Sequence, residues 1–319
     1  MNTPLPPPSV IIPTHDTRDL TLRCVETVEA EGTANLEIVV VDDGSSDGTA
    51  EALAAAHPRV RVVRGSPAQG FTRAANRGLA EAGGDVLLLL NSDTEVAPGA
   101  FAPLLAAFAR DPRLGAAGAA LHYPDGSPQW SGGGAPTLFW LFALASGLPP
   151  LLARLPVWRR VKPVGAPAAR VEWVTGAALA VRRQAWEEVG GFDEEFRFYA
   201  QDLDLCLRLR DAGWSVELLP EVRVLHHHGA TIGSRSHLEL LWTDLLLWAQ
   251  KHRGEGFARR AALALRGGAA LRRLGRAIAS PFVPADWRPA WQEESAALRR
   301  AVAALAAAAA QLANVGGPV

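Results

Sequence analysis

The stretch VVVDDGSSDG, residues 39–48, contains the pattern from which the fold of this chain follows. Its three valines end a mostly apolar run that begins at residue 36, and such a run predicts a strand buried on both faces of a parallel sheet. The acidic turn that follows puts Asp42 and Asp43 at the carboxyl end of this strand. In open α/β sheets this edge is where ligands bind, because loops and helix N-termini converge there.

Alternating strand and helix patterns continue on both sides of this stretch. Short apolar runs alternate with alanine-rich stretches from residue 10 to about residue 121, which is typical of a parallel sheet covered by helices. The run 9–12 is the first predicted strand, and the run 86–90 is a later strand that leads into Asn91, Ser92 and Asp93. Between them we expect helices at 49–57 and 71–82 and a strand at 60–64. The first half is therefore α/β.

The rhythm changes after residue 121. Residues 124–170 contain a turn, three successive glycines and many prolines, so we expect an irregular insertion there. The expected elements that complete the same domain are strands at 172–181, 214–219 and 222–225 and helices at 183–189 and 202–212. From about residue 234 the sequence is helical and rich in Leu, Ala and Arg. We therefore divide the chain into a disordered lead (1–8), an α/β domain (9–234) and a helical C-terminal region (235–319).

Composition excludes several classes of protein. The 319 residues include 32 basic and 33 acidic ones, so no positive field attracts the chain to nucleic acid. The first residues lack the features of a signal peptide, and the run 138–148 is about half the length that crosses a bilayer. We expect no transmembrane helix and a cytoplasmic protein. Cys24 and Cys206 lie far apart without a CxxC pair, which argues against disulfides and structural zinc.

Carboxylates replace the familiar nucleotide-binding signatures. The chain has no GxGxxG after its first strand and no GxxxxGK[ST], and acidic strand ends suit a diphosphate that a metal ion neutralises. One of Asp42 and Asp43 can accept the N3–H of a uracil- or thymine-type base. The alternative is a turn in which Asp42 binds backbone donors and Asp47 caps the next helix. Asp93 is either a metal-binding carboxylate or an ordinary turn residue.

Further polar residues have two interpretations each. Asp202 and Asp204 begin a predicted helix, where Asp is favoured for capping, yet one of them can serve as a general base toward an acceptor hydroxyl. His226 and His228 share one face of an extended segment and are either metal ligands or hydrogen-bonded histidines. Four tryptophans either line a sugar-binding cleft or pack in the core: Trp130, Trp140, Trp158 and Trp173.

Taken in order, these motifs resemble the family 2 glycosyltransferases, in particular their rhamnosyltransferase-like branch. Seven elements follow the family's order over residues 9–235: VIIPT (10–14), VVVDDGSSDGT (39–49), GF with ANRG (70–78), LNSD (90–93), TGA (175–177), GGFDE (190–194) and QDLDLCLR (201–208). The resemblance implies a GT-A fold, a nucleotide-sugar donor, a divalent metal (Mn²⁺ or Mg²⁺) and inversion at the anomeric carbon.

The resemblance also assigns roles to single residues. It implies that Asp43 contacts the base, that Asp93 binds the metal, that Asp202 is the catalytic base, and that His226 assists the metal or the diphosphate. The other residues that it places at the donor are Pro13, Thr14, Arg73, Asn76 and Ser92, of which Arg73 and Asn76 either lie near the phosphates or brace the donor loop. The residues that it places at the acceptor or sugar pocket are Trp173, Gly176, Ala177, Gln201 and Asp204.

Two positions depart from the family pattern. Gln201 stands where Glu usually precedes the catalytic Asp, and Asn91 replaces the first carboxylate of a DxD motif. The base and the last metal carboxylate remain, so we expect an active enzyme. The resemblance implies that it transfers a hexose or a deoxyhexose such as rhamnose from a UDP-, dTDP- or GDP-linked donor to a saccharide or lipid-linked acceptor, as in bacterial cell-surface polysaccharide synthesis. The alternatives are a non-catalytic nucleotide- or glycan-binding module and a sugar nucleotidyltransferase.

Two apolar runs and a group of arginines can be interpreted either as contacts with a membrane surface or as ordinary parts of the folded protein. The runs 138–148 and 242–248 either dock against a membrane surface or pack within the protein. The arginines of the C-terminal region either meet anionic headgroups or form a solvated helix face: Arg259, Arg260, Arg266, Arg272, Arg273 and Arg276.

Overall fold

The structure is a computed structural model of the chain, and it describes residues 7–148, 169–227 and 238–315. The chain divides into two compact units. The first comprises residues 1–134, 162–195 and 201–233, and the second comprises residues 135–161, 196–200 and 234–319. Residues 1–6 of the expected disordered lead (1–8) lie outside the described residues. The expectation is wrong for residue 8, because Pro8 begins the first strand and lies opposite Val86.

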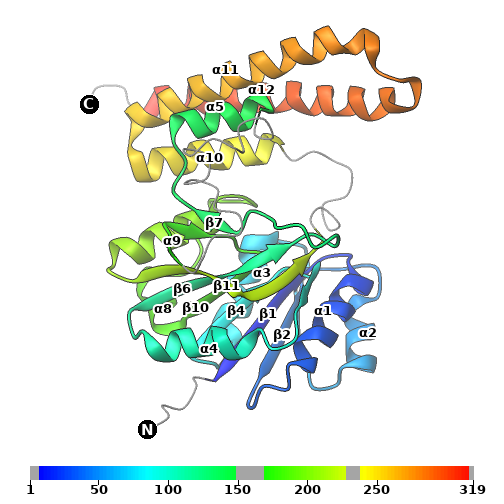
Figure 1. The fold of residues 1–319 in the computed structure, drawn as a ribbon, viewed down its shortest axis with the longest axis vertical. Coiled ribbons are helices and arrows are strands. Elements are labelled where there is room, and N and C mark those ends of the chain that lie inside the picture. Colours follow the sequence, from blue (N-terminus) through cyan, green and yellow to red (C-terminus); the bar gives the residue numbers. More distant parts are fainter. Residues whose placement is uncertain (1–6, 149–168, 228–237, 316–319) are drawn as a thin grey trace. The chain divides into compact units, whose positions relative to one another are not determined.

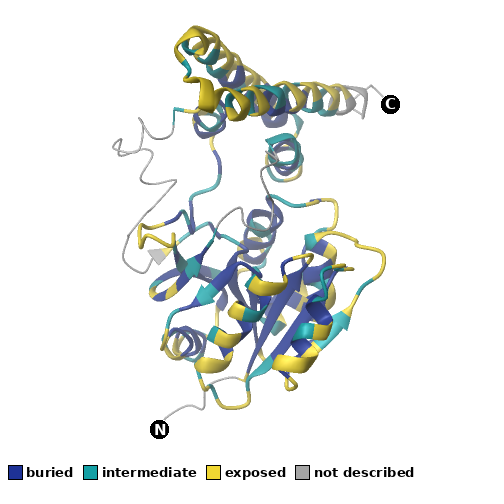
Figure 2. Cartoon of the chain, turned by 90° about the vertical axis from the view of Figure 1, so that its right-hand side faces the viewer, coloured by how far each residue is buried: buried dark blue, intermediate teal, exposed yellow. Residues whose placement is uncertain are grey.

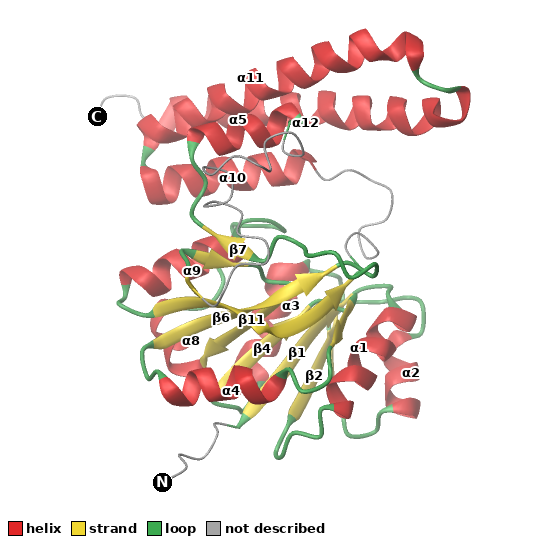
Figure 3. Ribbon diagram, viewed as in Figure 1, coloured by secondary structure: helices red, strands yellow, loops and turns green. Residues whose placement is uncertain are grey.

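A nine-stranded sheet forms the first unit (Figures 1 and 3). The strand order is β3-β2-β1-β4-β10-β6-β11-β5, and β8 pairs with β11. Its strands are β1 (Pro8–Thr14), β2 (Glu37–Asp42), β3 (Arg61–Arg64), β4 (Val86–Leu90), β5 (Thr94–Val96), β6 (Leu114–His122), β8 (Ala169–Arg170), β10 (Ala178–Arg182) and β11 (Ser215–His226). A separate two-stranded sheet pairs β7 (Gly132–Gly133) with β9 (Trp173–Val174). The expected α/β fold is confirmed.

Strand register decides which chain segments meet at one edge of the sheet. β1 is parallel to both β2 and β4, with Ile11 opposite Val39 on one side and Leu89 on the other. The carboxyl ends of these strands therefore meet at the same edge. β10 is antiparallel to β4, with Ala178 opposite Leu90, so β10 begins at this edge.

Helices cover the sheet, and their first-unit members are α1 (Arg18–Ala30), α2 (Thr49–Ala56), α3 (Phe71–Glu81), α4 (Phe101–Arg110), α8 (Arg183–Val189) and α9 (Gln201–Asp211). Gly78 shows how closely α3 lies on the sheet. A Cβ atom at this position would stand 2.5 Å from a methyl carbon of Ile11 and 2.6 Å from one of Val41. Only glycine lets the helix backbone approach β1 and β2 to this distance.

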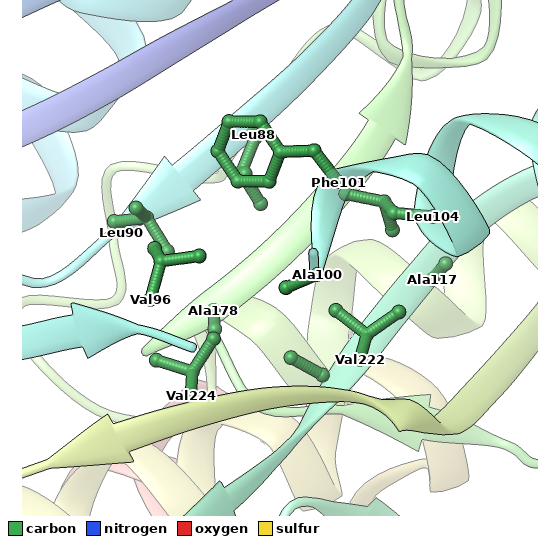
Figure 4. A pocket seen from close by; sticks show the side chains of 11 residues that line it. Leu88, Leu90, Val96, Ala100, Phe101, Leu104, Ala117, Ala178, Val222 and Val224 are labelled. Carbon is green, nitrogen blue, oxygen red and sulfur yellow. The ribbon is translucent and has the colours of Figure 1, made fainter. Parts of the chain in front are cut away.

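The core of the first unit is closely packed (dark blue in Figure 2). A void of about 10 Å³ lies among side chains of α4, β4 and β11, and its lining is entirely apolar, with Leu88, Phe101 and Val222 among its residues (Figure 4). A space this small and this apolar has no room or polar partners for a ligand. The ligand site must therefore lie elsewhere in the molecule.

Two strand predictions are corrected by the structure. The expected strand 172–181 is interrupted after β9, because residues 175–177 form a loop in which Gly176 donates its N–H to Asp202. The expected strands 214–219 and 222–225 are one strand, β11, whose register shifts between Leu219 and Arg223. Pro220 lies at this shift, and because proline lacks an N–H it is compatible with a bulge but not with a regular ladder.

The second unit is helical. It contains α5 (Leu138–Ser146), α10 (Leu238–Arg253), α11 (Glu255–Ala279), the short 3₁₀ helices η1 (Ser280–Phe282) and η2 (Ala285–Trp287), and α12 (Arg288–Val315). The prediction of an irregular insertion is therefore wrong for residues 138–146. α5 packs closely on α11, since a Cβ at Gly268 would meet the carbonyl oxygen of Phe142.

The two apolar runs that were weighed as membrane contacts pack within the second unit. Leu141 of α5 and Trp242 and Trp248 of α10 are fully buried. The interpretation as internal helix packing is thus confirmed for these side chains. Within the described ranges, none of the helices has both the length and the apolar character that crossing a membrane requires.

Candidate functional site

The edge where β1, β2 and β4 end brings the predicted site residues together. Asp43 donates its N–H to the Thr14 carbonyl (2.9 Å), which joins the ends of β1 and β2. Asn91 donates its N–H to the Ala177 carbonyl (3.0 Å), which joins the end of β4 to the start of β10. β11 ends here as well, because His227 donates its N–H to the Asp93 carbonyl (2.9 Å).

Asp93 is the residue with the least satisfied polar atoms at this edge. Its side chain is 1% exposed, and within the described residues neither carboxylate oxygen has a hydrogen-bond partner. The Nε2 atom of His226, itself buried, lies 3.3 Å from Asp93 Oδ1. A buried carboxylate without donors is costly unless a cation compensates it. The pair therefore points to a ligand that neutralises Asp93.

Gln129 fixes the orientation of the His226 ring. Its Nε2 donates to the His226 carbonyl (2.6 Å), so its Oε1 is the atom that faces His226 Nδ1 at 3.0 Å. Nδ1 must then carry the proton of a neutral ring, and the Nε2 lone pair lies on the side of Asp93. Metal-ligating histidines are commonly held in this way by a partner on the second nitrogen.

Asp93 and His226 fit a divalent cation. A carboxylate and a neutral imidazole are ordinary ligands for such ions. No group of three or more His, Cys, Asp or Glu side chains with metal-binding geometry occurs in the described ranges. The described protein thus offers two side-chain ligands and leaves further coordination positions to oxygen atoms of a bound ligand.

Asp43 organises the loop in front of α3. Its carboxylate accepts the N–H groups of Gln69 (2.8 Å to Oδ1) and Gly70 (2.8 Å to Oδ2). Asp42 accepts the Ser45 N–H (2.8 Å), and Asp47 accepts the Thr49 N–H (3.1 Å) where α2 begins. The turn and capping interpretation is confirmed for Asp42 and Asp47. The contact of Asp43 with a base stays a prediction.

A buried chain of hydroxyl groups connects the first strand with the loop after β4. Thr14 Oγ1 lies 2.8 Å from Thr17 Oγ1, which lies 3.0 Å from Ser92 Oγ. Pro13, the neighbour of Thr14, is buried in β1. The structure therefore places Pro13, Thr14 and Ser92 beside the Asp93 loop, and their contact with the donor stays a prediction.

Asp202 begins α9 and is held by backbone donors. Gly176 donates its N–H to Oδ2 (2.7 Å), and the N–H of Leu203 binds Oδ1 (2.8 Å). Burial raises the pKa of the Asp202 carboxyl above its ordinary value, and these N–H groups oppose the shift. A carboxylate with a raised pKa is a better proton acceptor. Because Gly176 precedes Ala177, which binds Asn91, this candidate base belongs to the same sheet edge.

Gln201 and Asp204 flank this base differently. Gln201 is buried, and its Oε1 has no hydrogen-bond partner within the described part of the chain. Asp204 is buried and bound by Arg208 (2.7 Å), which also donates to the carbonyls of Val189 and Gly191. The Asp204 carboxylate thus has a structural partner, and the acceptor role of both residues stays a prediction.

Trp173 is buried in β9 and packs edge-on against Trp130, with ring centroids 4.9 Å apart. Trp140 is buried in α5. Packing is therefore the observed role of Trp140 and Trp173, and a sugar contact of Trp173 stays a prediction. Trp158 and His228 lie outside the described residues.

Asn76 and Arg73 brace the loop after α8. Asn76 donates to the Phe192 carbonyl (2.9 Å) and accepts the Phe192 N–H (3.0 Å), while Arg73 donates to Glu194 (3.1 Å). A cavity of about 470 Å³ lies beside them, lined by Gln69, Arg73, Asn76, Arg77, Ala80 and Glu194. The structure thus shows both side chains bracing the loop 190–194, and their place near the phosphates or at the donor loop stays a prediction.

Gln129 is the site residue that the sequence analysis missed. It lies between β6 and β7, in the segment expected to be irregular, and no motif includes it. A lone glutamine has no sequence signature. Only the pairing of β11 with β6 and the chain reversal after β6 bring it to His226.

The first unit thus has a buried carboxylate and a buried histidine at the edge where its parallel strands end, and a candidate base on the neighbouring helix. Models of the families described as glycosyl transferase family 2 and glycosyl transferase family group 2 match residues 9–152 and 161–253. The chain is 35% identical over 222 residues to the N-acetylglucosaminyl-diphospho-decaprenol L-rhamnosyltransferase of Mycobacterium tuberculosis, covering 64% of this chain and 71% of that protein.

Solved structures agree on the fold. GalNAc-T7 with UDP, GalNAc and Mn²⁺ matches with a TM-score of 0.58 at 19% identity, covering 81% of this chain and 52% of that one. The mannosyltransferase PcManGT of Pyrobaculum calidifontis with GDP-Man and Mn²⁺ matches with a TM-score of 0.57 at 19% identity, covering 99% and 89%. The chain belongs to the family 2 glycosyltransferases, and within them it is rhamnosyltransferase-like.

Proposed function

We propose that this glycosyltransferase moves a hexose or a deoxyhexose such as rhamnose from a nucleotide-diphosphate sugar to a saccharide or lipid-linked acceptor, with inversion and with a divalent metal ion, in the synthesis of bacterial cell-surface polysaccharide. The name of the mycobacterial relative supports a rhamnosyl donor and a lipid-linked acceptor. The UDP, GDP-Man and Mn²⁺ named for the two solved structures support a nucleotide-linked donor and a divalent metal ion.

The buried, unpartnered carboxylate of Asp93 beside His226 Nε2 is the observation that supports this proposal most strongly. A structural aspartate in a turn satisfies its oxygens with backbone N–H groups, as Asp42 does here. Asp93 has none in the described chain, although it is almost fully buried. Its position is explained if a bound cation supplies the missing partner.

In the proposed mechanism the protein holds both reactants and moves one proton. Asp93 and His226 would hold the metal ion, which when bound supplies positive charge toward the leaving diphosphate. Gln129 keeps the Nε2 lone pair of His226 directed to that place. Asp202 accepts the proton of the acceptor hydroxyl as its oxygen attacks the anomeric carbon, and the bond to the nucleoside diphosphate breaks. One displacement inverts the configuration of that carbon.

The two alternatives to this function explain fewer features. A non-catalytic binding module does not explain why Asp93, His226 and the candidate base Asp202 are all kept at one edge of the sheet. A sugar nucleotidyltransferase usually opens with a glycine- and basic-rich loop after its first strand, and Pro13, Thr14, His15 and Asp16 stand at that place. The glycosyltransferase function is therefore preferred.

We place the enzyme in the cytoplasm with peripheral contact to the inner face of the plasma membrane. A nucleotide sugar is soluble in water, whereas a lipid-linked acceptor is held in the bilayer. The enzyme must then reach both phases during one turnover. This proposal depends on the acceptor class, which the mycobacterial relative suggests.

Thermal unfolding with UDP, dTDP, GDP and NADH, each with Mn²⁺ and with EDTA, tests the site. A ligand at a hundred times its dissociation constant stabilises the folded state by about 2.7 kcal/mol. We expect one nucleoside diphosphate to raise the melting temperature with Mn²⁺ only. Asp93→Ala should abolish the rise, and Asp19→Asn, at an exposed aspartate of α1, should keep it. A shift with NADH, or none with any diphosphate, contradicts the proposal.

A further inference from the structure

Helix α11 and the turn that follows it expose six large apolar side chains, which we call the apolar stripe: Leu263, Leu271, Leu274, Ile278, Phe282 and Trp287. Phe282 is 83% exposed and Trp287 is 68% exposed. Isolated apolar residues are common on protein surfaces, but six within one hairpin are not. Exposed parts of this hairpin are yellow in Figure 2.

The stripe is continuous along the helix. At about 100° per residue, the four positions in α11 and the projected position of Phe282 fall within an arc of about 100°. Leu263 and Ile278 are separated by about 22 Å along the axis. A different face of α11, which includes Ala261, Leu265 and Ala269, is buried against the other helices of the unit. The helix therefore has a second apolar face that the core of the unit does not use.

The charge beside the stripe is strongly positive. Residues 255–288, from the start of α11, contain seven arginines and two acidic residues, Glu255, which binds Arg259, and Asp286. Arg272 and Arg276 lie toward the core and bind Glu294 of α12. Arg266 and Arg273 are exposed, and the helical geometry places both along one edge of the stripe. Their long side chains can reach past the apolar residues while their charge stays in a polar layer.

We propose that the apolar stripe and its flanking arginines dock the second unit onto an anionic lipid bilayer. A linear apolar face about 22 Å long, bordered by arginines and ending in an exposed Phe and Trp, has the features of a helix lying in a membrane interface. Apolar side chains enter the headgroup boundary there, and each arginine near an anionic surface adds about a fivefold increase in binding. The inference goes beyond the transfer reaction, since it uses no residue of the donor site.

Vesicle cosedimentation of the full-length protein without donor or acceptor tests this surface directly. The vesicles contain phosphatidylcholine alone or phosphatidylcholine mixed with phosphatidylglycerol. We expect binding to the mixed vesicles only, with a loss of at least about tenfold in Leu274→Ser/Ile278→Ser. Arg266→Gln/Arg273→Gln should lose about 25-fold at low salt and less at high salt. The matched control Arg59→Gln/Arg113→Gln, at exposed arginines of the first unit, should bind as the wild type does.

Three results would overturn the proposal. The first is a wild type that does not sediment with the mixed vesicles, and the second is a Leu274→Ser/Ile278→Ser variant that sediments as much as the wild type. The third is a wild-type dimer and a monomeric Leu274→Ser/Ile278→Ser variant in sedimentation equilibrium, because a second copy of the chain would then cover the stripe. Because these substitutions replace exposed side chains, melting temperatures should stay close to that of the wild type and show that each variant is folded.

Discussion

Replacing Asp93 by asparagine should stabilise the metal-free protein while it removes the function. Both carboxylate oxygens of Asp93 are buried without hydrogen-bond partners in the described structure, and the nearest titratable group is the His226 ring. The Asp93→Asn change keeps the shape of the side chain and removes its negative charge. Its amide can also donate to His226 Nε2, whose lone pair lies on this side because Gln129 binds Nδ1.

The magnitude follows from the burial of Asp93. Leaving a buried polar group without a partner costs about 1–3 kcal/mol, and a charged group costs more. We therefore expect Asp93→Asn to raise the free energy of unfolding by about 1–3 kcal/mol in EDTA. For a protein of 319 residues that corresponds to a melting temperature higher by about 1.5–4.5 °C.

Melting curves in EDTA and in Mn²⁺ with the nucleoside diphosphate that binds are the assay. At a hundred times its dissociation constant the ligand adds about 2.7 kcal/mol to the wild type and nothing to the variant. The difference in stability should therefore move by about 2.7 kcal/mol in favour of the wild type: the variant melts higher in EDTA, and with the ligand the wild type melts higher or the two proteins melt at similar temperatures. Asp19→Asn, at an exposed aspartate, is the matched control and should follow the wild type in both conditions.

A lower melting temperature of Asp93→Asn in EDTA refutes the reasoning, because it means that the carboxylate has a stabilising partner within the protein. If the ligand raises the melting temperature of the variant and of the wild type equally, the proposed role of Asp93 in ligand binding is refuted, because binding then does not require the carboxylate.

The remaining predictions concern the base, the histidine and the packing of α3. Asp202→Asn should lower kcat by a factor of about 10²–10⁴ and keep the nucleotide-induced melting shift. Because burial raises the pKa of Asp202 and the carboxylate form is the base, wild-type activity should rise with pH to a midpoint above the ordinary aspartate value, which a pH–rate profile checks. Gln129→Leu should weaken Mn²⁺ binding about 10–100-fold in a titration calorimeter, whereas Gln129→Glu keeps an acceptor for His226 Nδ1 and should lose less. Gly78→Ala should destabilise by about 1–3 kcal/mol through contact with Ile11 and Val41, whereas Gly275→Ala, in open space on α11, should stabilise by about 0.5–1 kcal/mol in urea unfolding.

The sequence predicts the parts of the fold that depend on local patterns. The uniformly apolar runs 10–12 and 86–90 indicate strands buried on both faces, and the structure has β1 and β4 there. Local sequence patterns do not predict the structure of a segment that depends on contacts with residues far away in the chain. The loop 175–177 interrupts an apolar run because Gly176 binds Asp202, and α5 forms because α11 covers it.

The candidate site divides in the same way. Asp93, Asp202 and His226 belong to motifs with a fixed place at strand or helix ends, so the sequence indicates them. Gln129 depends on which side chains the fold brings together, and no spacing along the chain shows this. The ion pair of Asp204 with Arg208 differs, because the two residues lie four positions apart on one helix, a spacing that the sequence does show. The membrane surface is a case similar to that of Gln129. The apolar runs chosen from the sequence bury Leu141, Trp242 and Trp248, whereas the exposed stripe consists of scattered leucines, one isoleucine and two aromatic residues.

Product analysis of a single transfer reaction tests the central claim most directly. The protein is incubated with UDP-, dTDP- or GDP-linked sugars and a polyprenyl-diphosphate-linked saccharide, with Mn²⁺ or with EDTA, and the products are followed by proton NMR. We expect one donor to release its nucleoside diphosphate with Mn²⁺ only, and the transferred sugar to have the opposite anomeric configuration to the donor. Retained configuration, or equal turnover in EDTA, would contradict the account.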